Sequence, residues 1–352
     1  MPDSLPDDAL PIPDGYRELA EAVAWADVSP RVSVVVAGAD AVRFVDGFCT
    51  AAVGRIAPGA GGEAFFLDSR GQVLLWGTAL RAGDGVWIDA GVPPAEPEGE
   101  ARCLAAHLDR YHIRERLQVV DTAAASAWLL VAGPSAAAWL GAAGATLPAA
   151  SPIGHTVDRM EAFAAGDFPG TCAGVPAAIV RGSWAGAGSF LVVVPAVERA
   201  RLVDRLRDDG VPVAAPAALE SARLEAGRPG PADFPPRTLP QEVGRDREAI
   251  AFDKGCYLGQ ETVARLDSLG HVNRRLVVVL SRRTRLAPGM RVEARGDAEA
   301  VGTISSAAPS PRHGGWLGMA MVRVAALGRD GDWHVAGDAV TRLDDGGGGR
   351  RG

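Results

Sequence analysis

The sequence is almost without lysine and asparagine. Of its 36 basic residues, 35 are arginine and one is lysine, Lys254, and Asn273 is the one asparagine. Arginine carries a wide, permanently charged fork, whereas lysine carries a compact ammonium whose pKa shifts readily. A chain that uses arginine wherever a positive charge suffices is expected to need the smaller group at Lys254. Both rare residues lie within 254–273, so this segment is the first candidate for a functional site.

Signals for export and for membrane insertion are also missing. The first basic residue, Arg17, follows four aspartates, so the charged start of a signal peptide is absent. The longest uncharged run, 122–157, is mostly alanine and is broken by glycines and prolines, unlike a membrane-spanning helix. We therefore expect a cytoplasmic protein that does not enter a membrane.

Paired cysteine motifs are absent as well. The four cysteines, Cys49, Cys103, Cys172 and Cys256, are scattered, with no Cys-x-x-Cys. This spacing argues against a disulfide scaffold and against a self-contained metal site. We expect free thiols and no bound metal.

The overall composition is that of a folded, acidic protein. Hydrophobic residues make up 47% of the 352 residues, enough for a sizeable core in two or three domains. The net charge of −7 argues against nonspecific nucleic-acid binding, which needs a basic surface. Seven arginines of the last third could form such a surface locally, but a solvated face is the favoured interpretation. They are Arg274, Arg275, Arg282, Arg283, Arg285, Arg291 and Arg295.

An internal similarity predicts two related α+β lobes. Residues 34–45 and 129–140 both read as an apolar strand, a glycine turn and a helix, with Asp40 and Ser135 as helix N-caps. Alternating apolar residues predict further strands, and helical spacing predicts three more helices. The strands are expected at 64–67, 73–80, 86–90, 117–121, 128–131, 177–181 and 190–194, the helices at 98–111, 196–209 and 216–226, and a long ordered loop at 227–247.

The pattern changes from Arg274 onward. Short apolar runs alternate with glycine and proline turns, which is typical of a small all-β barrel or sandwich. The runs are 276–280, 290–294, 301–304, 317–322 and 333–336.

Two segments carry a family resemblance. Residues 222–229 read Ala-Arg-Leu-Glu-Ala-Gly-Arg-Pro and continue to Leu-Pro-Gln-Glu at 239–242, and residues 252–265 contain Lys-Gly-Cys-Tyr-Leu-Gly-Gln-Glu. Together they resemble the YgfZ family, folate-binding relatives of the glycine-cleavage T-protein, GcvT. The resemblance covers about residues 16–345.

This resemblance implies a fold and a domain plan. The expected fold is α+β, with three GcvT-like domains around a central channel: two related α+β lobes and a small C-terminal β-barrel. The expected boundaries are 16–272 for the folate-binding region, with lobes at about 28–122 and 123–230 and a connector at 231–272, then 273–345 for the barrel. Residues 1–15 and 346–352 are expected to be tails.

The resemblance also implies a function. The channel would bind tetrahydrofolate or another folate, and the protein would support assembly or repair of iron–sulfur enzymes, including those that thiolate tRNA. Its partners would be iron–sulfur proteins, with an indirect link to tRNA-modifying enzymes. The alternatives are a folate-dependent aminomethyltransferase and a non-enzymatic scaffold that transiently binds an iron–sulfur cluster.

The motif itself suggests a reactive thiol. Cys256 is expected at or just before the N-terminus of a helix that runs to Gly270, with Lys254 two residues away. A helix dipole and an ammonium both lower a thiol pKa, so Cys256 and Lys254 are the candidate catalytic pair. Gly255 and Gly259 allow a tight turn or close approach of a ligand. The alternative is a buried cysteine beside a lysine that pairs with an acid.

Seven further residues are candidates for motif or ligand binding. Gln260 and Glu261 could orient a substrate, Tyr257 could stack on a planar ring, and Gly259 could allow close approach. By resemblance Arg223 and Glu225 line the folate channel, and Arg265 faces it; a surface ion pair is the alternative for each. Glu242 could fix the loop that covers the motif.

The sequence departs from the aminomethyltransferases in three places. Their Gly-Gly-x-x-Asp-Asp run corresponds to Arg70–Leu75 without an acid, their Tyr-Thr-Gly-Glu to Trp184–Ala187, and their Thr-Asn-Asp to Thr50–Ala52. Without a positioned carboxylate, general acid–base help to a one-carbon transfer is hard to supply. These departures argue against a true aminomethyltransferase, and leave folate binding intact.

Overall fold

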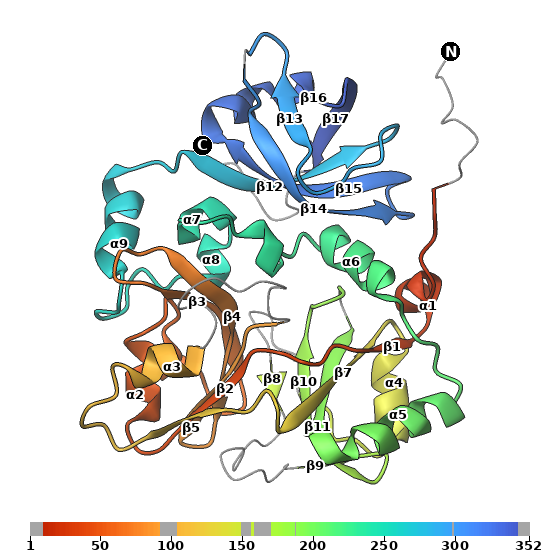
Figure 1. The fold of residues 1–352 in the computed structure, drawn as a ribbon. Helices are drawn as coiled ribbons and strands as arrows, with labels where there is room; N and C mark the ends of the chain where they lie inside the picture. Colours follow the sequence, from red (N-terminus) through yellow and green to blue (C-terminus); the bar gives the residue numbers. More distant parts are fainter. Residues whose placement is uncertain are drawn as a thin grey trace.

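Two sheets and a closed barrel form three units joined by short helices. The computed structural model describes residues 10–91, 104–148, 156–157, 170–186, 188–297 and 299–343. The two sheets lie side by side, the barrel lies over them, and helices of the connector fill the layer between (Figure 1). The expected α+β class with a C-terminal barrel is confirmed.

The first sheet has the strand order β3-β4-β5-β2-β6. Helices α2 and α3 pack on its outer face, where Val34, Phe66 and Leu108 are buried. The start of the helix expected at 98–111 lies outside the described residues, and α3 is its second half. The elements are β2 Ser33–Ala37, α2 Ala41–Asp46, η1 Val53–Arg55, β3 Gly61–Leu67, β4 Val73–Ala82, β5 Gly85–Asp89, α3 Leu104–Asp109 and β6 Gln118–Asp121.

The second sheet has the order β1-β7-β11-β10-β8, with β9 paired to β10. Strand β1 precedes the first sheet in the chain but pairs antiparallel with β7, so the N-terminal segment belongs to the second lobe. Helices α4 and α5 appear where the sequence predicts them. The elements are α1 Tyr16–Glu21, β1 Ala24–Asp27, β7 Ser126–Ala132, α4 Ala136–Ala142, β8 Thr156–Val157, β9 Gly170–Cys172, β10 Val175–Gly182, β11 Ser189–Pro195, η4 Ala196–Glu198 and α5 Arg199–Asp208.

Two tryptophans join the sheets. Trp87 of the first sheet and Trp128 of the second are fully buried, with ring centroids 4.8 Å apart. Leu80 and Leu191 belong to the same apolar cluster. Large aromatic side chains dominate such interfaces because each buries a large apolar area. The two lobes therefore share one core.

The connector holds more helix than its composition suggests. The region expected as a long loop, 227–247, contains three short helices, and the helix expected at 216–226 is α6. No helix within the described ranges is long and apolar enough to cross a membrane. Helix α6, Pro216–Glu225, precedes the connector, whose elements are η5 Pro231–Asp233, α7 Pro240–Val243, α8 Asp246–Ala249 and α9 Gln260–Leu269.

The C-terminal strands close into a barrel in the order β12-β15-β14-β13-β16-β17. Its interior is apolar and includes the fully buried Trp333. Closure leaves no open sheet edge. The five expected strands are present, and β17 is an addition that the pattern did not reveal. The elements are β12 Arg274–Ser281, β13 Arg291–Ala294, β14 Gly302–Ser310, β15 Gly315–Arg323, η6 Val324–Asp332, β16 Trp333–Val335 and β17 Asp338–Leu343.

Candidate functional site

The segment between α8 and α9, residues 250–259, is named here the motif loop. It lies against the first lobe through backbone hydrogen bonds: Ala251 N donates to Thr50 O at 2.9 Å, and Leu258 N donates to Gly47 O at 3.0 Å. The Thr50 hydroxyl accepts a hydrogen bond from Phe65 N at 2.9 Å. The motif loop is therefore fastened to the segment that follows α2.

Lys254 is the main fastening. Its Nζ donates to the carbonyl oxygens of Asp46 at 2.5 Å, Cys49 at 3.0 Å and Ala51 at 2.6 Å. Its side chain is only 2% exposed. An ammonium has three N–H donors, and all three are engaged by backbone oxygens. The ammonium therefore holds the backbone at and after the end of α2, and it also lies 3.4 Å from the Asp46 carboxylate. The sequence did not predict this task, and the pairing of Lys254 with Cys256 stays a prediction.

Cys256 is exposed on the outer side of this loop. Helix α9 begins at Gln260, after Gly259 as N-cap, so Cys256 lies just before the helix rather than within it. Burial raises the pKa of Cys49 and of Cys172 to about 11. Cys103 lies outside the described residues, and among the other three Cys256 is the accessible thiol.

Tyr257 points inward. Its ring is 9% exposed, belongs to a core cluster with Phe65 and Leu67, and lies 5.1 Å from the Lys254 ammonium. Burial raises the pKa of its phenol to about 12. The ring is covered by the protein, so the expected stacking on a planar ligand does not match this geometry.

Gly259 meets the β3–β4 hairpin. Its φ is +81°, and a Cβ there would lie 2.8 Å from Asp68 O and 2.9 Å from Gly71 Cα. Only glycine fits this position without strain. The close approach expected at Gly259 therefore exists, but the partner is the protein's own hairpin.

Of the other candidates on α9, one contacts the motif loop and two are exposed to solvent. Gln260 turns back, and its Oε1 accepts from Tyr257 N at 3.3 Å. Glu261 and Arg265 are exposed on the helix. The structure therefore does not bring these three side chains together with Cys256 into one pocket.

Arg223 and Glu225 connect α6 to the barrel. The Arg223 guanidinium donates to Asp233 Oδ2 at 2.9 Å, to Ser306 Oγ at 2.8 Å and to the carbonyl oxygen of Arg228 at 2.5 Å. Glu225 accepts from Ser310 Oγ at 2.5 Å. Arg223 also forms an ion pair with Glu220 of the same helix at 2.6 and 2.8 Å, so the expected alternative of an ion pair on α6 is present beside the contacts to the barrel.

Glu242 joins the connector to β12. It accepts from Leu239 N at 3.0 Å, which caps α7, and forms a two-pronged ion pair with Arg274 at 3.0 and 2.9 Å. Arg275, next in β12, donates to Gln241 O at 3.2 Å. These two arginines face the connector, which corrects their expected place on the solvated face of the barrel.

A buried charge cluster between the lobes was not foreseen. We name it the inter-lobe centre: Glu63, Trp76, Ser183, Arg228 and Arg245. Glu63 of β3 accepts from Arg228 at 3.1 Å and from Arg245 at 2.9 and 2.7 Å. Arg228 also donates to Ser183 Oγ of the second lobe at 2.9 Å and lies 5.0 Å from the Trp76 ring.

The charged groups of Glu63 and Arg228 are buried in the inter-lobe centre. Two guanidinium groups share one carboxylate, and Glu63 and Arg228 are each about 8% exposed. Burial lowers the pKa of Arg228, and Glu63 opposes this shift. Trp76 Nε1 is buried without a hydrogen-bond partner among the described residues. Buried polar groups normally have partners, so this N–H is a donor available to a ligand.

The sequence held one signal for this centre. Arg228 lies within the Ala-Gly-Arg-Pro run, residues 226–229, of the resembling motif. Glu63 lies in an otherwise ordinary strand, 165 residues from Arg228, and no local pattern connects the two.

The turn of the hairpin that faces the motif loop holds one acid, Asp68. Asp68 Oδ1 accepts from Arg70 N at 2.9 Å and from Gln72 N at 2.8 Å, so this acid shapes the turn. In the described residues no three His, Cys, Asp or Glu side chains are grouped to hold a metal ion.

Comparison with known proteins identifies the family. The model of the GCVT N-terminal domain matches residues 11–254. The chain belongs to this family. An aminomethyltransferase of Streptomyces avermitilis is 32% identical over 169 residues, which are 45% of this chain and 44% of that protein. The chain thus matches less than half of this relative's length.

The GCVT assignment extends to the whole fold. The crystal structure of the glycine cleavage system aminomethyltransferase T from Bartonella henselae superposes with a TM-score of 0.78 and 20% identity, over 94% of this chain and 87% of that one. The expected GcvT-like arrangement of lobes and barrel is confirmed.

Proposed function

We propose that this GCVT-family chain binds tetrahydrofolate in the inter-lobe centre, with the plan expected from the sequence: lobes at about 28–122 and 123–230, a connector at 231–272 and a barrel at 273–345. The observation that carries the proposal is the unpartnered Trp76 N–H beside two guanidinium groups that share one carboxylate.

The chemistry of the centre fits this ligand. A folate has a flat, nitrogen-rich ring with hydrogen-bond acceptors and a tail with carboxylates. Arginine forks bind carboxylates in two-pronged geometry, and a site with aromatic walls and few polar groups suits a planar molecule. When bound, tetrahydrofolate supplies the nitrogen atoms that carry a one-carbon unit.

Each residue of the centre has a distinct task. Arg228 and Arg245 hold the anionic or carbonyl groups of the ligand, and Glu63 keeps both guanidinium groups in place. Trp76 donates its N–H and covers the ring. Arg223 positions Arg228, because its guanidinium donates to the carbonyl oxygen of Arg228 at 2.5 Å.

Calorimetric titration with tetrahydrofolate tests the proposal. Trp76→Phe keeps an aromatic ring but removes the N–H, and should weaken binding by about three- to tenfold, the worth of one hydrogen bond. Arg228→Gln should weaken binding more than tenfold, because a charge-assisted bond is lost. Arg291→Gln, on the exposed face of the barrel, serves as the control. Absence of binding to the parent chain, or unchanged affinity in both site variants, contradicts the proposal.

Aminomethyl transfer is the first candidate activity. The relatives found by sequence and by fold are aminomethyltransferases, which supports this reading. Because Asp68 shapes a turn and Arg70–Leu75 holds no acid, we expect at most slow transfer from a one-carbon folate.

The second candidate is the YgfZ role in upkeep of iron–sulfur proteins, including tRNA-thiolating enzymes. The exposed thiol of Cys256 within the Lys-Gly-Cys-Tyr motif favours it. Because the described residues hold no group of metal ligands, Cys256 would act as a single thiol on a partner rather than as a cluster scaffold.

A Cys256→Ser variant separates the two activities. It should lose the ability to restore iron–sulfur enzyme activity in a strain that lacks the protein, while its tetrahydrofolate affinity and its stability stay unchanged. Full restoration of iron–sulfur enzyme activity by Cys256→Ser would show that the thiol is not needed for this function. Steady one-carbon turnover by this variant would favour the transferase.

A further inference from the structure

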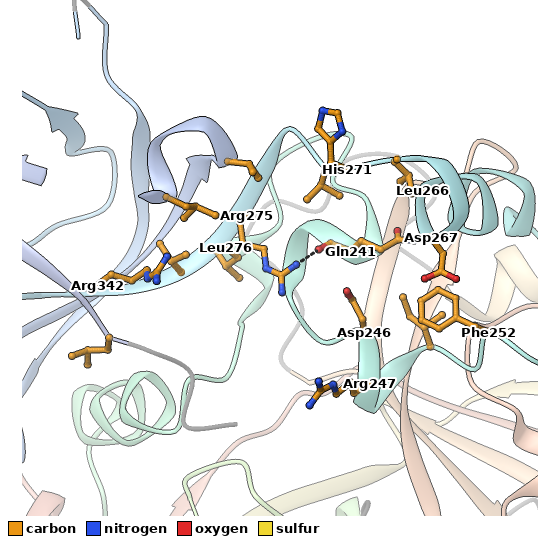
Figure 2. A pocket seen from close by; sticks show the side chains of 17 residues that line it. Gln241, Asp246, Arg247, Phe252, Leu266, Asp267, His271, Arg275, Leu276 and Arg342 are labelled. Carbon is orange, nitrogen blue, oxygen red and sulfur yellow. Dashed lines mark hydrogen bonds between the residues drawn. The ribbon is translucent and has the colours of Figure 1, made fainter. Parts of the chain in front are cut away.

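A second pocket lies outside the inter-lobe centre. Its volume is about 910 Å³, and it opens between α8, α9 and barrel strands β12 and β17 (Figure 2). No residue of the inter-lobe centre lines it. The size is in the range of sites that hold small organic ligands.

The walls combine apolar and basic side chains. Ile250, Leu266, Leu276, Leu343 and the half-exposed ring of Phe252 make the apolar part. The basic part comes from two directions: Arg275 of β12 and Arg342 of β17 lie on neighbouring barrel strands, and Arg247 comes from α8 (Figure 2).

Two acids, Asp246 and Asp267, also line the pocket. Asp246 Oδ1 is buried without a hydrogen-bond partner among the described residues, and so is Oε1 of Gln241, which is 7% exposed. A buried carboxylate oxygen without a hydrogen-bond donor raises the free energy of the charged form of the carboxyl group. Burial of this oxygen without a donor therefore disfavours the charged form of Asp246.

We infer that this pocket binds a small organic anion, a molecule with one phosphate or carboxylate group on an apolar body. The anion lies on Arg247, Arg275 and Arg342, and the body lies on Phe252 and the leucines. The site is separate from the folate centre and does not depend on the function proposed above.

The charges around Asp246 make the binding pH-dependent. Burial raises the pKa of Asp246 to about 6, Arg275 lowers it, and Glu248 and Asp267 raise it. Arg247, His271 and Arg342 are the other ionisable groups in the pocket wall. As the pH falls from 7.5 to 5.5, Asp246 gains a proton and the pocket loses one negative charge, so the anion binds more tightly.

Calorimetry with three probes tests the inference on the full chain: adenosine 5′-monophosphate, octanoate and inorganic phosphate. We expect at least one of the first two to bind about tenfold more tightly than phosphate. Octanoate, whose carboxylate stays mostly ionised over this range, should bind several-fold more tightly at pH 5.5 than at pH 7.5, whereas the phosphate of adenosine 5′-monophosphate itself gains a proton at about pH 6. Asp246→Asn should remove most of this pH dependence, and Arg247→Gln should weaken binding about tenfold. Arg291→Gln is the control.

Two outcomes would overturn the inference. One is the absence of binding tighter than about 1 mM for all three probes. The other is unchanged affinity in both Arg247→Gln and Arg342→Gln. Because neither residue touches the inter-lobe centre, tetrahydrofolate binding in the same variants reports separately on the folate site.

Discussion

At the scale of single residues, the only lysine is explained by geometry rather than by reactivity. Three carbonyl oxygens converge on Lys254 Nζ within 3.0 Å, at the end of α2 where backbone carbonyls lack helical partners. A compact ammonium matches three such oxygens, whereas a planar guanidinium does not. Thirty-five positions tolerate arginine and this one requires the smaller cation.

Replacement of Lys254 should destabilise the protein. Lys254→Met leaves three buried carbonyl groups without their donor, and we expect the free energy of unfolding to fall by about 2–4 kcal/mol. Lys254→Arg should fail to restore it. Guanidinium-induced unfolding measures the change, and Arg265→Met, exposed on α9, is the matched control. A loss below about 0.5 kcal/mol in Lys254→Met would show that the contacts carry no stability.

At the scale of elements, the hairpin β3–β4 and the start of α9 lock together through two glycines. Gly71 and Gly259 both have φ near +80°, and a Cβ on either would collide with the backbone of the other segment. Thr262 Oγ1 adds a hydrogen bond to Arg70 O at 2.8 Å. The position of the exposed Cys256 thus depends on a contact made by its neighbours.

The two glycines of the motif should differ in their tolerance of alanine. A methyl group at Gly259 meets backbone atoms below 3.0 Å and demands a positive φ, so Gly259→Ala should lower the free energy of unfolding by about 2–3 kcal/mol. Gly255→Ala meets nothing within 4 Å and should be close to neutral. Thermal unfolding of both variants makes the comparison; equal losses would contradict the packing argument.

At the scale of the whole molecule, buried polar contacts join the barrel to the lobes. Asp233 is fully buried and accepts from Arg223 of α6 at 2.9 Å and from Ser306 of β14 at 2.7 Å. Glu225 and the Glu242–Arg274 pair make further links between connector and barrel. The placement of Arg228 in the inter-lobe centre depends on the same network, because Arg223 holds its carbonyl oxygen.

Replacement of Arg223 should weaken these contacts between the barrel and the lobes. Arg223→Met leaves the Asp233 carboxylate buried without its cation, a change that costs about 3–5 kcal/mol in buried pairs. Hydrogen exchange should become faster in η5 and β14 while β10, in the second lobe, keeps its protection. Arg291→Met, on the outer face of the barrel, should exchange like the parent chain. Unchanged exchange in β14 would mean that apolar packing alone holds the barrel in place.

The sequence by itself determined the class of the fold, most elements and the region of interest. Alternating and helical spacing reveal burial, which is a local property, so β12–β16, α5 and α6 were predictable. Strand β1 was not, because its four residues form a strand only through pairing with β7, about a hundred residues away. The rarity of lysine singled out the motif loop, whose functional role stays a prediction, and did not reveal the contacts of Lys254.

Only the tertiary structure decided where these side chains meet. Glu63 reaches Arg228 and Arg245 across 165 and 182 residues, and Trp76 lacks a partner only because two lobes close around it. Such pairings depend on how the two sheets pack against each other. A local sequence pattern carries no information on this packing. The same holds for Asp246, whose pKa is raised first by burial and then by Glu248 of its own helix and Asp267 of α9.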